Sequence, residues 1–481
     1  MLRSLSVFLF LLLSLSGCVS SPQPSMIDEG SAHCEQTLQR FYQEIDDTRD
    51  YLLPYHLDPQ FPHLAFDRIS ASFANQLNTD ASRAEWLSYV SELGQQQLTM
   101  AMVLSPHIQP KQHAALTQCQ QALTNDSADN DDFWQTIRDN PPMLPTAYQH
   151  WKRVLGAYPI ARMVAEPRIK QEQDHIRSAF GRHLAHPYSY GEHPQASSPR
   201  LTQQQRSRLV QSAGQSSSLG WPVLNDRQAE QLLNHYSPVV TVETLTQDDL
   251  VGALGLDDAN TPFVNTQVPM IYRGISYTRF DGDILPQLNY VLWFPARTAK
   301  GAFDPYAGPL DAINLRLTLD TDGSPLIFDS IHQCGCFHMV YALKPTLQFK
   351  QSDDERPIEN HLPQPSSSSR LHVSLTGGEH MVNQVSFTDN IPATIRLEAS
   401  PLATLMTLKT KTGSMMSPFN RHGVITESAR GEEWFLWPFG VRSPGAMRQQ
   451  GQHAIAFVGE RHFDEAFLFD GLLERTEDPK R

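Results

Sequence analysis

The strongest constraint on the fold is a change in hydrophobic periodicity part-way along the chain. Between residues 28 and 190, apolar side chains recur three or four positions apart, as Leu38, Phe41 and Tyr42 do, and this spacing places them on one face of a helix. Beyond residue 265, apolar and polar residues alternate, which is the period of a half-buried strand. The pattern predicts an α+β fold, with a helical N-terminal domain followed by a mainly antiparallel, β-rich C-terminal domain.

Turn signals and composition set the expected boundaries. Asp322 and Gly323 separate two alternating apolar runs, which predicts a β-hairpin. Residues 191–224 are rich in Pro, Ser, Gln and His, so we interpret them as a linker or long loop between a helical domain at 28–190 and a β-rich domain at 225–475.

The N-terminus has the features of an export signal. Arg3 is followed by an apolar stretch from Leu5 to Leu15 and then by small residues. The stretch is too short, and wrongly flanked, for a spanning helix, so we expect residues 1–17 to form a signal peptide.

The sequence Leu15-Ser16-Gly17-Cys18 resembles the lipobox of bacterial lipoproteins. The resemblance implies that Cys18 carries lipid, including palmitate, and becomes the first mature residue, with residues 18–27 as a tether. Val19 stands where lipoproteins retained in the inner membrane typically carry Asp, so the resemblance implies the outer membrane.

This location sets the expected partners. A lipid anchor would hold the protein on the membrane, facing the periplasm or the cell surface, where an envelope protein or the cell wall could be a partner. The formal charge of −14 argues against nucleic acid, whose phosphates require Lys and Arg.

Export also bears on the cysteines, because disulfides persist outside the cytoplasm. With Cys18 assigned to lipid, Cys34, Cys119, Cys334 and Cys336 remain, and an even number favours pairs. The simplest arrangement is a Cys34–Cys119 disulfide between two helices. Two buried free thiols are the alternative.

The main candidate site is the stretch "IHQCGCFHM", in which His332, Cys334, Cys336 and His338 occupy alternate positions. On a straight strand these side chains share a face, but the outer two lie about 20 Å apart. Ligands of one zinc ion lie within about 2.3 Å of it. The two histidines can share an ion only if the chain bends sharply, and Gly335 is the residue that would allow the bend.

Three interpretations of this stretch stay open. Two thiolates with one imidazole suit Zn²⁺ or Cu⁺, with His380, His453 or His462 as a further candidate ligand. The two cysteines could instead close a strained, easily reduced disulfide, or they could remain free thiols. The "IHQCGCFH" region also resembles uncharacterised lipoproteins of Gram-negative bacteria, a resemblance that implies no particular activity.

A polar loop at 295–311 precedes the predicted hairpin and contains Arg297, Lys300, Asp304 and Asp311. Ordered polar loops often line functional sites, but a solvent-exposed connection between two strands would have the same composition. Two functions therefore compete. The first is an outer-membrane-anchored lipoprotein that binds Zn or Cu through the Cys/His cluster. The second is an envelope enzyme that uses the same cluster, either as a metal-assisted hydrolase or as a thiol redox protein. No cofactor other than Zn or Cu is expected, and the sequence leaves open whether the protein is an enzyme.

Overall fold

The computed structural model describes residues 29–476 except 106–108, 193–199, 353, 367–368 and 389–392. The expected signal peptide at residues 1–17 and the expected tether at residues 18–27, with the lipidation site Cys18, lie outside these residues.

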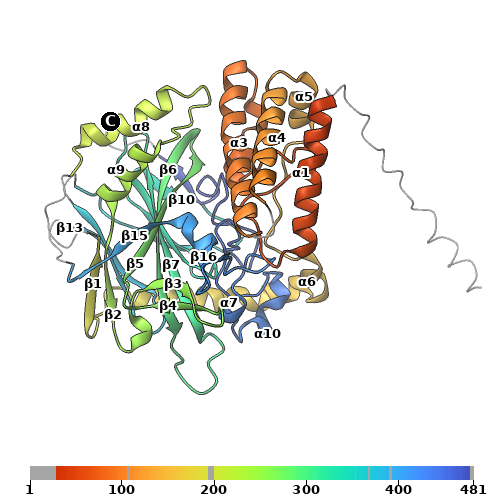
Figure 1. Cartoon of the computed structure of the whole chain (residues 1–481). Coiled ribbons are helices and arrows are strands. Elements are labelled where there is room, and N and C mark those ends of the chain that lie inside the picture. The colour runs from red at the N-terminus through yellow and green to blue at the C-terminus, as the bar shows by residue number, and fades with distance from the viewer. Residues whose placement is uncertain are drawn as a thin grey trace, which may run out of the picture.

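Most helices of the described part lie in its N-terminal half, as the periodicity predicts (Figure 1). The α-helices are α1 (Glu29–Thr48), α2 (Arg68–Ala71), α3 (Asp80–Val103), α4 (Pro110–Ala128), α5 (Asp131–Asp139), α6 (His150–Leu155), α7 (Tyr158–Ser178), α8 (Gln203–Gln215), α9 (Asp226–Tyr236) and α10 (Glu433–Leu436). Short 3-10 helices are η1 (Ala74–Gln76), η2 (Gln247–Asp249), η3 (Leu402–Met406), η4 (Thr426–Ser428) and η5 (Trp437–Phe439).

Capping and a disulfide hold the first helices in place. The Thr79 hydroxyl accepts a hydrogen bond of 3.1 Å from the Ser82 backbone N–H, which satisfies one free donor at the start of α3. A disulfide joins Cys34 of α1 to Cys119 of α4, with the two Cα atoms 4.8 Å apart. The predicted Cys34–Cys119 pairing is therefore confirmed.

Two sheets form the β-rich part. The larger has the order β11-β9-β8-β7-β6-β5-β15, and the smaller has the order β13-β12-β2-β1-β14. Their strands are β1 (Pro187–Gly191), β2 (Val239–Glu243), β5 (Met270–Phe280), β6 (Asp283–Arg297), β7 (Gly308–Leu319), β8 (Pro325–His332), β9 (Met339–Ala342), β11 (Ile358–His361), β12 (Arg370–Leu375), β13 (Val382–Thr388), β14 (Ile395–Arg396) and β15 (Glu398–Pro401). Three two-stranded ladders pair β3 (Ala253–Leu256) with β4 (Pro262–Asn265), β10 (Leu347–Phe349) with β18 (Leu473–Arg475), and β16 (Leu408–Lys409) with β17 (Met415–Met416).

The central strands β5 to β9 pair antiparallel in chain order, so the α+β class and the mainly antiparallel sheet are both confirmed. The predicted hairpin at Asp322-Gly323 joins β7 to β8, and Gly323 has a φ of +71° there. Glycine adopts this left-handed conformation without steric cost.

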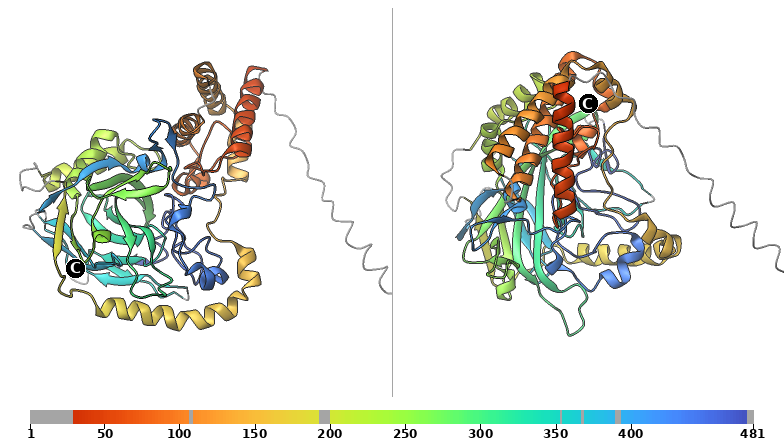
Figure 2. Two further views of the ribbon diagram at one scale, coloured as in Figure 1. Left: turned by 60° about the horizontal axis from the view of Figure 1, so that its bottom comes forward. Right: turned by 45° about the vertical axis from the view of Figure 1, so that its right-hand side comes forward.

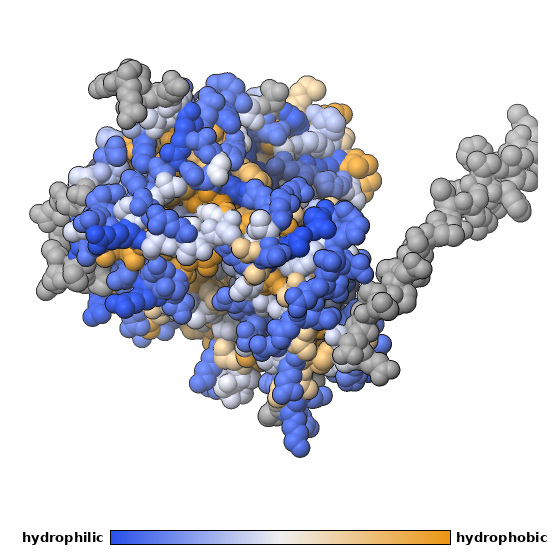
Figure 3. Space-filling view, turned by 90° about the horizontal axis from the view of Figure 1, so that it is seen from above, coloured by the Kyte–Doolittle hydropathy of each residue, from blue (hydrophilic) through white to orange (hydrophobic). Residues whose placement is uncertain are grey.

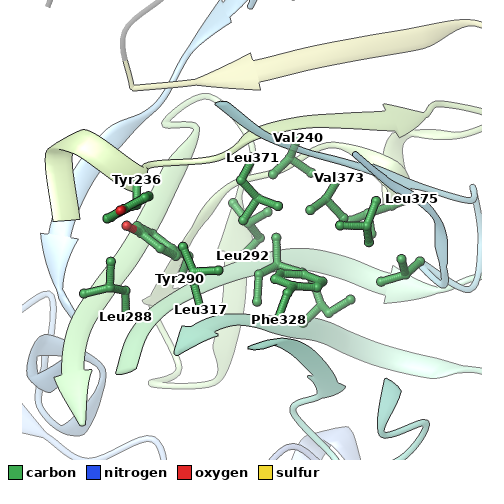
Figure 4. Packing of buried hydrophobic residues seen from close by; sticks show 14 of the residues in the cluster. Tyr236, Val240, Leu288, Tyr290, Leu292, Leu317, Phe328, Leu371, Val373 and Leu375 are labelled. Carbon is green, nitrogen blue, oxygen red and sulfur yellow. The ribbon is translucent and has the colours of Figure 1, made fainter. Parts of the chain in front are cut away.

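The inner faces of the two sheets enclose the largest hydrophobic core (Figure 4). Leu292 of β6, Leu317 of β7 and Phe328 of β8 meet Val240 of β2 and Val373 of β12. Because strand side chains alternate, the same strands also have an outer face. The outer face packs against the C-terminal segment 455–473 and, at its edge, against the helical part.

The expected boundaries differ from the structure in two places. Strand β1 begins at Pro187, inside the range expected to be helical, because it pairs with β2. The range 191–224, expected to be a linker or long loop, contains helix α8. Thr202 caps the start of this helix together with Gln205. Among the described residues, none of the helices is long and apolar enough to cross a bilayer.

Candidate functional site

The stretch that carries both free cysteines forms a tight turn at the end of β8. The His332 N–H donates to the Cys336 carbonyl at 3.1 Å, and the Gly335 N–H donates to the His332 carbonyl at 2.7 Å. Gly335 has a φ of +88°, and a Cβ atom there would lie 2.2 Å from the Ala454 carbonyl oxygen. Only glycine fits both conditions without a shift of the backbone. The sharp bend expected at Gly335 is present.

The turn brings the two cysteines together. Cys334 and Cys336 are both free thiols, and they lie close enough for each to shift the pKa of the other. Cys334 is buried, whereas Cys336 is partly exposed at the surface of the turn.

The turn sends the two histidines to different carboxylates. His332 Nδ1 lies 3.7 Å from Asp311, and His338 Nε2 lies 3.1 Å from Asp329, which also forms an ion pair with Arg316. Among the described residues, no group of three His, Cys, Asp or Glu side chains is placed to hold one metal ion. The four residues of the expected H-x-C-x-C-x-H cluster therefore do not converge on one point in this conformation.

The three further candidate ligands are also placed elsewhere. His380 contacts Asp311, His462 accepts a hydrogen bond from the Ala147 N–H, and His453 is buried beside the Phe463 ring. Burial lowers the pKa of His453 to about 3. In the described part of the chain, none of the three completes a metal-binding group with the cysteines.

Asp311, at the start of β7, is the centre of a buried charge cluster. Its carboxylate is 3.0 Å from the Arg430 guanidinium and 2.7 Å from His380 Nδ1. The ring of His380 stacks on Phe294 with the centroids 3.8 Å apart, and its Nε2 lies 3.3 Å from Asp249, too poorly aligned for a hydrogen bond.

The cluster determines the charge of its members. Burial alone would raise the pKa of Asp311, but Arg430 and the neighbouring histidines hold it well below its usual range. Burial alone would lower the pKa of His380, but the carboxylates of Asp249 and Asp311 raise it above its usual value. Burial lowers the pKa of His332. Burial therefore favours the neutral form of His332, whereas the two carboxylates favour the protonated form of His380.

Arg430 connects this cluster to the thiols. The hydrogen bond from Cys336 lowers the pKa of Cys334, burial opposes this effect, and the positive charge of Arg430 adds to the lowering. The same hydrogen bond and burial raise the pKa of Cys336 well above its usual value. The pair therefore loses its first proton more easily than an ordinary thiol does and holds the second more tightly.

The polar loop at 295–311, for which the sequence left a site-lining role and a solvated connection open, begins near the cysteine turn. Arg297 forms an ion pair of 2.7 Å with Glu379, and its guanidinium lies 5.8 Å from the centre of the Phe337 ring. Lys300 also pairs with Glu379, at 2.5 Å. Asp304 accepts hydrogen bonds from loop backbone N–H groups and so fixes the loop itself.

Three residues around the turn have left-handed backbones although they are not glycine. Leu310 precedes Asp311, Phe337 follows Cys336, and His380 belongs to the cluster, with φ angles of +60°, +58° and +52°. Each such conformation costs about 1–3 kcal/mol, and strain of this kind concentrates at functional sites. The strain supports the choice of this end of the sheet as the candidate site.

Sequence reasoning missed Arg430 and Asp249, which complete the cluster. Both lie far from the cysteines along the chain and belong to no motif. Arg430 is completely buried and its Nε and Nη1 have no hydrogen-bond partner among the described residues, so its charge is directed into the site rather than into solvent.

No protein-family model, curated protein or solved structure matches this chain.

Proposed function

We propose that the protein is an exported, outer-membrane-anchored lipoprotein whose Cys334–Cys336 pair passes disulfides to thiols in the cell envelope. The observation that carries the redox part is the arrangement of the pair: two free thiols lie on one tight turn, of which Cys334 is buried and Cys336 is partly exposed. The positive charge of Arg430 also acts on Cys334. This is the thiol redox alternative among the functions that the sequence leaves open.

Cys336 is the less buried of the two cysteines, so in this proposal a substrate thiolate attacks the pair at Cys336. In the oxidised pair, that thiolate attacks Cys336, a mixed disulfide forms, the Cys334–Cys336 bond breaks, and Cys334 leaves as a thiolate. A thiol of low pKa leaves faster, so Arg430 favours this step.

A second substrate thiolate then attacks the substrate sulfur of the mixed disulfide and releases Cys336, which takes up a proton. The substrate dithiol is oxidised by two electrons, and the pair is reduced by two. A small-molecule disulfide restores the oxidised pair by the reverse exchange. A disulfide between cysteines two residues apart is strained, and strained disulfides are easily reduced, so the oxidised pair acts as an oxidant.

The anchoring part of the proposal rests on the N-terminal sequence. Leu15-Ser16-Gly17-Cys18 supports lipidation at Cys18, and Val19 supports the outer membrane. The Cys34–Cys119 disulfide fits a compartment in which disulfides persist. Cys18→Ala should block processing of the signal peptide and should leave the protein without acylation. An unchanged acylated mass in that variant would reject the anchor.

Mixed-disulfide trapping tests the redox part. We expect Cys334→Ser to accumulate one glutathione adduct on Cys336, because the sulfur that would expel the glutathione is missing. The matched Cys336→Ser variant should stay unmodified, because Cys334 is buried. Equal labelling of both variants by intact-protein mass spectrometry would contradict the proposed division of roles.

Metal binding remains a second candidate because of one observation. Both ring nitrogens of the buried His332 lack a hydrogen-bond partner among the described residues, although the ring lies in the same turn as the thiols. Two thiolates and this imidazole would suit Cu⁺ or Zn²⁺.

Metal analysis of the reduced protein separates the two candidates. Stoichiometric Zn or Cu that is lost in the Cys334→Ser/Cys336→Ser variant would support binding. His332→Ala should then weaken the binding, whereas His338→Ala should not, because His338 is held by Asp329. An equally low metal content in the wild type and the double variant would reject metal binding, and the redox function would be the remaining candidate.

A further inference from the structure

The helices α6, α7 and α10 present an unusual set of exposed apolar side chains. On α6 these are Trp151, Val154 and Leu155, and on α7 they are Ile160, Met163 and Val164, each with more than half of its surface exposed. Within each helix the spacing is i, i+3, i+4, so each set shares one face.

Two further exposed aromatic residues lie on α10, which η5 connects to α6. Trp434 is 86% exposed and Phe435 is 47% exposed. The short helix η5 follows α10 directly and packs against α6, since the Gln149 N–H donates to the Gly440 carbonyl at 2.6 Å and Arg153 Nε donates to the Phe439 carbonyl at 2.8 Å. We call the eight apolar residues of α6, α7 and α10 the helical apolar surface.

The position of α7 leaves this surface open. In the left view of Figure 2, α7 runs along the lower edge of the molecule, with α6 at its right-hand end and the C-terminal segment beside that end. Along α7, Ile176 near the end of the helix is buried, and Gln173 donates to the Arg356 carbonyl at 2.7 Å. By contrast, the opposite side of the molecule is covered mainly by hydrophilic side chains, with hydrophobic ones in the recesses (Figure 3).

The charge of the segment points to the kind of surface it meets. Residues 150–170 contain Lys152, Arg153, Arg162, Arg168 and Lys170 but only one acidic residue, Glu166, in a chain whose formal charge is −14. Arg153 and Arg162 form ion pairs with Glu460 and Glu166. Among the described residues, the other three have no carboxylate partner within ion-pair distance, so they remain available to an external anion.

Exposed Trp, Leu, Ile, Val and Met beside Lys and Arg are the composition of helices that lie in the plane of a membrane surface. Tryptophan favours this interface because its ring is apolar and its N–H can stay hydrated. Protein–protein interfaces, by contrast, are depleted in Lys relative to the rest of the surface. We propose that the helical apolar surface lies on anionic phospholipid, with its apolar side chains among the acyl chains and Lys152 and Arg168 at the phosphates.

This inference does not depend on the thiol chemistry, and its test does not depend on lipidation. The whole chain is placed in vesicles of phosphatidylethanolamine with either phosphatidylglycerol or phosphatidylcholine, so that the N-terminal segment attaches every variant alike. Phospholipids brominated on their acyl chains then quench any tryptophan that reaches the apolar layer. Of the seven tryptophans, Trp86, Trp134, Trp221 and Trp293 are buried, and Trp151 and Trp434 are more than half exposed. The seventh, Trp437, is partly buried and is present in every variant.

We expect strong quenching of the wild type in phosphatidylglycerol vesicles and at least a twofold smaller effect in Trp151→Phe/Trp434→Phe. Val154→Asp/Met163→Asp should lose the quenching while keeping its circular dichroism, because both side chains are exposed. The control Leu245→Asp changes a residue of similar exposure outside the surface and should behave as wild type.

Three results would overturn the proposal. Equal quenching of the wild type and the Trp151→Phe/Trp434→Phe variant would show that the tryptophans do not reach the acyl chains. Equal quenching in phosphatidylcholine vesicles would reject the role of charge. A dimer that Val154→Asp/Met163→Asp dissociates, measured by light scattering, would assign the surface to a second copy of the chain.

Discussion

Replacing Asp311 with asparagine removes the negative charge on which the buried cluster depends, with little change in shape. Arg430, 3.0 Å away, would then be a buried cation without its counter-charge. The protonated form of His380, 2.7 Å away, would lose one of the two carboxylates that favour it. Removing one partner of a buried ion pair costs about 3–5 kcal/mol, because the other partner stays desolvated. We expect the free energy of unfolding of Asp311→Asn to fall by about this amount.

Urea unfolding, followed by tryptophan fluorescence and circular dichroism, measures the change. The matched control is Asp258→Asn, because Asp258 is exposed and pairs only with the exposed Lys411, so its loss should cost less than about 1 kcal/mol. A loss below about 1 kcal/mol for Asp311→Asn would refute the view that its carboxylate neutralises the buried cations.

The same carboxylate makes stability depend on pH. Because the pKa of Asp311 is lower in the folded state than the ordinary 3.8, its contribution is complete above that value and is lost as the pH falls through the folded pKa. The wild type should therefore lose more stability than Asp311→Asn when urea unfolding is repeated below pH 4. Parallel losses in the two proteins would show that Asp311 is not held ionised.

The remaining predictions concern the turn, the thiols and the disulfide. Gly335→Ala should lower the free energy of unfolding by about 1–3 kcal/mol, because φ is +88° and the new Cβ would meet the Ala454 carbonyl. Urea unfolding measures the change, and an unchanged midpoint would contradict the prediction. Arg430→Gln should raise the pKa of the Cys334 thiol, measured from thiolate absorbance against pH, and an unchanged titration would exclude the guanidinium as its cause. Cys119→Ala should lower the stability by about 2–4 kcal/mol, and a reducing agent should then have no further effect on unfolding.

Local patterns were enough to predict the architecture. Helical and strand periods separate the two parts of the chain, Asp322-Gly323 specifies its hairpin, and Cys34 and Cys119 were the cysteines left to pair. Helix α8 was missed because its polar composition resembles a loop, although Thr202 with Gln205 is a capping pattern that could have indicated its start.

The site was predicted only in part, because it depends on tertiary contacts. Alternate spacing placed His332 and His338 on one face, but this holds only for an extended strand. The turn at Gly335 changes the direction of the chain, so that His338 contacts Asp329 while both cysteines stay on the turn. Arg430 belongs to a distant segment and acts on Cys334 through its charge, so no spacing rule could reveal it.

The redox equilibrium of the Cys334–Cys336 pair tests the central claim most directly. The whole chain is equilibrated with mixtures of reduced and oxidised glutathione, quenched with acid, alkylated and analysed by peptide mass spectrometry. We predict reversible conversion between the dithiol and an internal Cys334–Cys336 disulfide, with the Cys34–Cys119 disulfide unchanged throughout. If the pair stays in one state across all mixtures, or forms only separate glutathione adducts, the proposed thiol exchange is wrong.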